Sequence, residues 1–182
     1  MSREFPDYID PWKAADGRRR FQGTMPIKRM KRLMPLLELD SPAAADDLET
    51  VFQIAFRRDR QGLVIVDVAT RTILPLLCQR SLVPYGETVD RNSRLAVITE
   101  LSEADELPDS YDPLLVEDGR IAMIDVVEDE LLLAVPQVPR NPEVAAVEMS
   151  TGGEDKPPPV EEERTHRPFA GLAGLMKDSS GD

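Results

Sequence analysis

The chain has 182 residues, a formal net charge of −12 and a single cysteine. This length can bury one good hydrophobic core, and one cysteine excludes an internal disulfide framework and a cysteine-rich zinc site. No apolar run approaches the roughly 20 residues that a membrane-spanning helix needs, and the N-terminus has no signal-peptide pattern. We therefore expect a cytoplasmic protein with one folded domain, no membrane association and flanking tails.

The charges are distributed unevenly along the chain. Residues 1–80 carry a small positive excess, whereas residues 81–182 carry a large negative one. Between Lys13 and Arg32 there are eight basic residues and one acid, Asp16. A basic stretch in an acidic protein can bind phosphate groups or this protein's own acidic half. The sequence leaves both possibilities open.

The N-terminal region has the start and stop signals of a short helix, followed by the pattern of a strand. Asp10 suits the N-cap, Pro11 the first helical position and Gly17 the position just past the last turn. Trp12, the only tryptophan, is best interpreted as a packing anchor for this helix, although it could stack on a base. A strand is expected at 21–25.

A second short helix is expected after Pro26, with Pro35 ending or kinking it. Its buried stripe would be Ile27, Met30, Leu33 and Met34. The candidates for phosphate contact are the basic residues of both helices and their connection: Lys13, Arg18, Arg19, Arg20, Lys28, Arg29, Lys31 and Arg32. The alternative is an ordinary solubilising surface, because no aromatic pair or RNP-type motif accompanies these cations.

A series of short strands follows the loop at 41–47. Alternation at 51–56 and β-branched runs at 63–68 and 72–77 predict strands, as does 94–101. Pro75 indicates an edge or a bulge. Strands joined by turns, without a strand-helix-strand rhythm, predict an antiparallel meander curled toward a small barrel. Helices before and after it would cover its open face, which makes the fold α+β.

One longer helix is expected near 122–135, after a short strand and the tight turn Asp118-Gly119. Apolar residues recur at helical spacing at Ile124, Val127, Leu131 and Ala134, and Pro136 ends the run. Asp125 and Asp129 share another face, with Glu128 at its edge. Residue types alone favour a solvated face for 127–130, because three adjacent acids point in different directions and do not converge on a catalytic pair or a metal.

The composition changes after Pro139, so we place the domain boundary at residue 140. Residues 141–165 are acidic and proline-rich with few large apolar groups, which predicts a disordered linker. Residues 166–177 are apolar again, with Phe169, Leu172 and Met176 on one helical face. Such a short amphipathic segment suits a docking peptide, bound either by its own domain or by a partner.

No catalytic, cofactor or metal site is evident in the sequence. His166 is the only histidine and lies beside the predicted linker, which argues against a histidine-dependent nucleophile. The glycines form no phosphate-binding loop. Cys78 ends an apolar strand and is interpreted as a packing residue. We therefore expect a protein that is not an enzyme, has no small-molecule substrate and needs no cofactor.

Four motifs in order resemble the YceD family, the large ribosomal RNA subunit accumulation proteins of bacteria. They are LCQRSLVPY at 77–85, YDPL at 111–114, VEDELLLAVP at 127–136 and RPFAGLAGL at 167–175. The similarity includes IDP at 9–11 and FQG at 21–23, so nearly the whole chain takes part. The family pattern usually has a second cysteine three residues after the first, and here that residue is Ser81. This departure removes any site built on two thiolates at that turn.

The resemblance implies a non-enzymatic role in the synthesis, processing or stability of 23S rRNA, and so in biogenesis of the large ribosomal subunit. The partner would be rRNA or a precursor particle of that subunit. The eight N-terminal cations become candidates for rRNA contact. The acidic face at Asp125, Glu128 and Asp129 becomes a candidate surface for a basic ribosomal or assembly protein. The alternative is a protein-protein adaptor without direct RNA contact.

Overall fold

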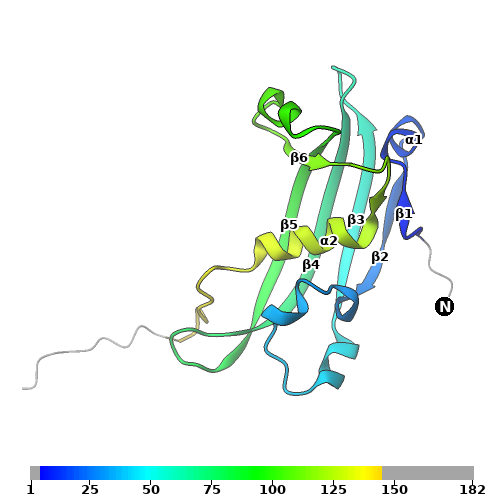
Figure 1. The fold of residues 1–182 in the computed structure, drawn as a ribbon. Coiled ribbons are helices and arrows are strands. Elements are labelled where there is room, and N and C mark those ends of the chain that lie inside the picture. The colour runs from blue at the N-terminus through cyan, green and yellow to red at the C-terminus, as the bar shows by residue number, and fades with distance from the viewer. Residues whose placement is uncertain (1–4, 145–182) are drawn as a thin grey trace, which may run out of the picture. The chain divides into compact units, whose positions relative to one another are not determined.

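The computed structural model describes residues 5–144, and Figure 1 shows their arrangement. The strands are β1 (Tyr8–Ile9), β2 (Arg20–Pro26), β3 (Glu49–Arg58), β4 (Val64–Leu77), β5 (Pro84–Ile98), β6 (Asp112–Leu115) and β7 (Ile121–Ala122). The helices are α1 (Pro11–Asp16) and α2 (Met123–Ala134), and four 3-10 turns are η1 (Ile27–Arg29), η2 (Met34–Leu36), η3 (Pro42–Asp47) and η4 (Leu101–Glu106). The predicted linker is described only to residue 144, and the predicted docking peptide at 166–177 lies outside the described residues. The boundary at residue 140 stays a prediction.

The main sheet is open and has the order β2-β3-β4-β5-β6. β2 to β5 pair antiparallel, whereas β6 runs parallel to β5. The mixed α+β class is confirmed. The predicted curl toward a small barrel is not, because β2 and β6 each have one strand neighbour within this sheet of the described chain. The purely antiparallel meander is wrong at β6, where the connection that contains η4 brings the chain back for parallel pairing.

The strands are longer than the sequence pattern predicts. The runs predicted at 63–68 and 72–77 form the single strand β4, and β5 begins at Pro84 rather than near residue 94. Pro75 lies past Arg71, where β4 no longer pairs with β3 and has only β5 beside it. The Pro75 carbonyl accepts a hydrogen bond from the Glu38 N–H at 2.9 Å. The edge character expected of this proline is therefore correct, although the sheet continues through it.

The first helix forms as predicted. Asp10 caps α1, because its Oδ1 accepts the Lys13 N–H at 3.0 Å, and Pro11 occupies the first helical position. Trp12 is half-buried and packs against the hydrophobic core, as expected of an anchor. Gly17 lies just past the last helical residue, as predicted, but it keeps an ordinary negative φ and Arg18 adopts the positive one.

The second predicted helix is wrong, because the segment forms the separate turns η1 and η2. Met30, between them, has an extended backbone with φ −88° and ψ 90°. The N–H groups of Arg32 and Leu33 bind a side chain of α2 instead of carbonyls of the preceding turn. The predicted burial is still right for Ile27, Met30 and Leu33, which are fully buried, while Met34 is half-buried.

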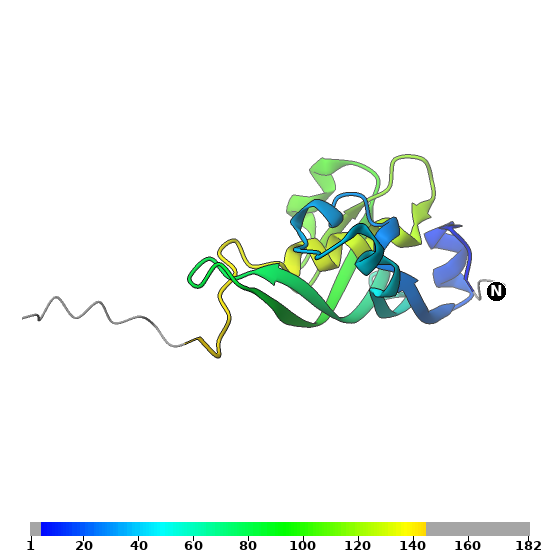
Figure 2. The same cartoon turned by 90° about the horizontal axis from the view of Figure 1, so that it is seen from below.

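α2 crosses one face of the sheet, and Figure 2 shows the helix and the turns η1 and η2 on that same side. Phe52, Ile54 and Phe56 of β3 point toward this side, and Val127 and Leu131 of α2 complete the core. The alternation of β3 explains the arrangement, because every second side chain of a strand faces the same way. Within residues 5–144, the helices are all too short or too polar to cross a membrane.

Candidate nucleic-acid interface

The eight candidate cations fall into two groups. Four of them bind carboxylates, in the pairs Lys13 with Asp10 (3.2 Å), Lys28 with Asp46 (2.8 Å), Arg29 with Asp7 (3.3 Å) and Arg32 with Glu128 and Asp129 (3.1 and 2.6 Å). The other four, Arg18, Arg19, Arg20 and Lys31, are exposed, and within the described residues their side chains make no ion pair or hydrogen bond. The stretch is therefore only partly available to an external anion.

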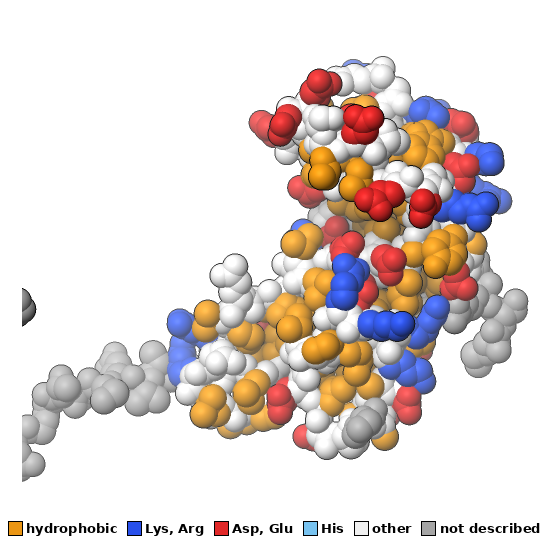
Figure 3. Space-filling model, viewed as in Figure 1, with side chains coloured by type: hydrophobic (Ala, Val, Ile, Leu, Met, Phe, Trp, Pro, Cys, Tyr) orange, Lys and Arg blue, Asp and Glu red, His pale blue; other side chains and the backbone are white. Residues whose placement is uncertain are grey.

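Arg18, Arg19 and Arg20 follow the end of α1 directly and lead into the edge strand β2. Arg18 has a φ of 46°, in the left-handed region that normally favours glycine. Its N–H donates to the Ala15 carbonyl at 3.0 Å, and the Arg19 N–H donates to the Ala14 carbonyl at 2.9 Å. These bonds close the helix as a Schellman-type cap with arginine at the left-handed position. In Figure 3, Lys and Arg side chains gather at the edge of the molecule beside α1.

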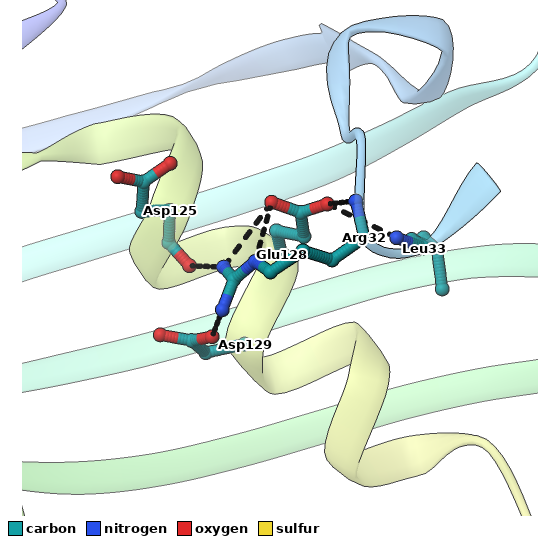
Figure 4. Close-up of polar contacts among 5 residues, drawn as sticks. All are labelled: Arg32, Leu33, Asp125, Glu128 and Asp129. Carbon is teal, nitrogen blue, oxygen red and sulfur yellow. Dashed lines mark hydrogen bonds and ion pairs between the residues drawn. The ribbon is translucent and has the colours of Figure 1, made fainter. Parts of the chain in front are cut away.

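Arg32 is the last residue of the basic stretch, and α2 holds it in place (Figure 4). One carboxylate oxygen of Glu128 accepts the N–H groups of Arg32 and Leu33 at 2.6 and 3.0 Å, and the other accepts from the Arg32 guanidinium. Asp129 binds the same guanidinium at 2.6 Å. Burial alone would lower the pKa of Arg32, but hydrogen bonds and charge from Asp129 and Glu128 outweigh it and raise that pKa.

The interpretation of residues 127–130 as a solvated helix face is wrong. Glu128 is 4% exposed and Glu130 is 2% exposed. Glu130 accepts hydrogen bonds from the Arg91 guanidinium and the Ser93 hydroxyl of β5. Buried carboxylates need such partners, because an unpaired charge in the interior is very costly. Both acids therefore attach α2 to the rest of the domain.

The candidate partner surface is smaller than the sequence indicates. Asp125 is exposed, and among the described residues its carboxylate makes no ion pair or hydrogen bond, whereas its backbone carbonyl lies 3.5 Å from an Arg32 nitrogen. Glu128 is buried, and half of the Asp129 side chain is covered. The three apolar members of that surface, Phe169, Leu172 and Met176, lie outside the described residues. Of the three acids, Asp125 alone keeps a carboxylate that no other described residue binds.

Cys78 lies at the turn between β4 and β5, inside the resemblance motif at 77–85. Its sulfur is buried and accepts the Asn141 N–H at 3.3 Å. Hydrogen bonding lowers the pKa of the Cys78 thiol to about 6, first from the Ser81 hydroxyl and then from the Asn141 and Ser81 backbone. The Ser81 hydroxyl is buried and makes no hydrogen bond of good geometry among the described residues, so its contact with the sulfur is a loose one. Three or more metal-ligand side chains do not come together anywhere in residues 5–144.

Sequence reasoning missed a set of polar side chains on the face of the sheet that points away from α2. Gln22 of β2, Gln53 of β3, and Asn92 and Arg94 of β5 are aligned on that face by the strand register. The alternation in β3 predicts its core-facing residues, and its outward-facing residues carry no motif of their own. The same period, applied to outward residues of neighbouring strands, could have found them.

The fold and the site together define an α+β protein with strands packed under one long helix and a cationic segment at its edge. The family model described as "Large ribosomal RNA subunit accumulation protein YceD" matches residues 66–176. A protein of that name from Haemophilus influenzae is 32% identical over 179 residues, which cover 96% of this chain and 97% of the relative. No solved structure matches. The chain belongs to the YceD family, and the resemblance found in the motifs is confirmed.

Proposed function

We propose that this protein supports the accumulation of large-subunit ribosomal RNA by binding the RNA directly in the cytoplasm, without catalysing a reaction. The family and the Haemophilus influenzae relative are named for RNA accumulation rather than for a chemical step. The bacterial RNA concerned is 23S rRNA, in a precursor of the large subunit. The protein then acts by protecting or positioning the RNA during synthesis or processing.

One observation carries this proposal. Arg18, Arg19 and Arg20 are consecutive, exposed and unpaired with any acid of residues 5–144, in a chain whose net charge is −12. Other cations of the chain are neutralised by its own acids, and the pairs of Lys28 and Arg32 are examples. Three adjacent guanidinium groups left without partners fit a polyanion, because each can replace a counterion at a phosphate.

The test measures how binding to 23S rRNA fragments depends on salt. Replacing Arg18, Arg19 and Arg20 with alanine should reduce the slope of log affinity against log salt by roughly one for each phosphate that an arginine binds. The matched control is the triple alanine variant of Arg60, Arg120 and Arg140, which removes three exposed and unpaired arginines elsewhere in the described chain. Equal slopes for the two triple variants would refute direct binding through these residues.

The second candidate function is a protein adaptor that touches no RNA, and the availability of Asp125 favours it. Asp125→Lys reverses that charge without breaking the Arg32 contacts, which use its backbone carbonyl only. Sedimentation of a lysate with and without RNase separates the two functions. Co-migration with large-subunit precursors that RNase disrupts supports RNA binding, whereas a complex that survives RNase and is absent in Asp125→Lys supports the adaptor.

A further inference from the structure

The face of the sheet opposite α2 is uncovered within the described chain. In Figure 2 the helices and turns of residues 5–144 lie above the strands, and the lower side of β2 to β5 is bare. The register places outward side chains in rows across the four strands. One row is Gln22, Gln53, Ala69 and Asn92, and the neighbouring rows are Thr24, Val51, Arg71, Asp90 and Arg20, Ala55, Asp67, Arg94.

The first two rows line an open hollow of about 680 Å³. Its centre is low because Ala69 lies between the longer side chains of Gln53 and Asn92. Gln22, Gln53 and Asn92 supply three amides, and each amide carries both donors and an acceptor. Side chains of this type hydrogen-bond the edges of nucleobases. The only ion pair at the rim of this hollow, among the described residues, joins Arg71 and Asp90.

A second hollow of about 450 Å³ adjoins the first and shares Gln53 and Asn92 with it. Its floor carries Asp67, which binds Arg57 at 2.7 and 3.2 Å and lies 3.9 Å from Arg94. An arginine guanidinium is charged in proteins, and hydrogen bonds to Asp67 raise the pKa of Arg57 further. Arg20 stands at the far end of the same row. Three arginines against one carboxylate leave this part of the face positive.

Amides beside a positive hollow match the two parts of a nucleotide, a base and a phosphate. A metal ion would require several converging carboxylates, and this face has Asp67 and Asp90 in separate ion pairs. An apolar protein segment would leave the three amides without partners, which opposes its burial there. The chemistry of the face therefore favours RNA over these alternatives.

We propose that the hollows at Gln53 and Asn92 bind an unpaired segment of RNA, with bases against the amides and phosphates at Arg94 and Arg20. Arg20 connects this face to Arg18 and Arg19 at the edge strand, so one RNA chain can pass from the cationic end of β2 onto the sheet. This inference rests on the proposed function and specifies its RNA as single-stranded.

The experiment compares two double variants with the same change in charge. Gln53→Glu and Asn92→Asp together place two negative charges in the hollows, while Gln61→Glu and Gln79→Glu place two on exposed turns away from this face. The probe is an unpaired RNA of about ten nucleotides. Its affinity is compared with that of the duplex formed by the same sequence. All four side chains are exposed, so both variants should keep the wild-type urea midpoint.

We expect the Gln53 and Asn92 variant to bind the unpaired RNA at least about tenfold more weakly than its control, because like charges oppose the phosphates. Duplex affinity should fall equally in both variants. Equal affinity for unpaired RNA would overturn this site, and direct binding through Arg18 to Arg20 would stand if its salt-slope test succeeds. A variant that loses the precursor particle but keeps its RNA affinity would show that this face binds protein, which also overturns the proposal.

Discussion

Arg18 and Arg32 belong to the same basic stretch, yet their surroundings are opposite. Arg18 is exposed, has a left-handed backbone and makes no side-chain hydrogen bond or ion pair with any described residue. Arg32 binds Glu128 and Asp129 with its side chain and Glu128 with its own N–H. The Arg18 backbone is strained and its side chain is unpaired within the described residues. Arg32 instead links α2 to the turns that cover the sheet.

This difference separates the cations that hold the fold from those whose side chains are available to an external anion. A density of basic residues in a sequence measures only how many cations are present. Whether each one is available depends on acids that are distant in the chain, such as Glu128 for Arg32 and Asp46 for Lys28. The availability of Arg18, Arg19 and Arg20 is therefore the informative result, and their number is not.

The largest expected loss of stability comes from removing the buried carboxylate that holds Arg32. Glu128→Ala removes the acceptor of two N–H groups and leaves that of the fully buried Leu33 unsatisfied. We expect the free energy of unfolding to fall by about 3 kcal/mol. The measurement is urea unfolding.

Asp129→Ala is the matched control, since Asp129 is the next residue of α2 and binds the same guanidinium from the surface. An ion pair that is half exposed on both sides contributes no more than about 1 kcal/mol. If the two variants lose the same stability, then the burial of Glu128 is not what attaches the turns to α2.

The elements that depend on neighbouring residues could be predicted from the sequence. Asp10 and Pro11 mark the start of α1, because capping is decided within one turn. The spacing of Val127 and Leu131 locates α2, and the alternation of β3 identifies its buried side chains. The four motifs also identify the family, which the comparisons confirm.

The features that depend on distant residues could not be predicted in this way. Glu128 and Asp129 are adjacent and both carry a carboxylate, so the sequence does not distinguish them. Only Glu128 is buried, and its carboxylate accepts the N–H of Leu33, which lies 95 residues away in the chain. The same contact draws Arg32 and Leu33 out of a helix that the sequence pattern favours. The parallel pairing of β6 is also invisible in a strand pattern, because parallel and antiparallel strands share one period.

For the exposed Arg18 we expect a smaller change in the free energy of unfolding, and of the opposite sign. Arg18→Gly removes the steric conflict at a φ of 46°, so we expect unfolding to become harder by about 1 kcal/mol. The same change should lower the salt slope of RNA binding by roughly one. Arg19→Gly is the control, because Arg19 has no positive φ and glycine there should reduce stability. A fall in stability in both variants would contradict a strained Arg18.

A prediction of a different kind concerns Cys78, which lies at the opposite end of the sheet from Arg18 and is tested by titration. Its pKa is lowered to about 6 from 9.0, so the folded state prefers the thiolate. This contribution to stability is complete above pH 9.0 and is lost as the pH falls through about 6, so stability should rise across that window. Ser81→Ala removes the largest cause and should raise the pKa of the thiol. As the chain has one cysteine, thiolate absorbance reports it alone, and an unchanged titration in Ser81→Ala would show that the hydroxyl does not act on the sulfur.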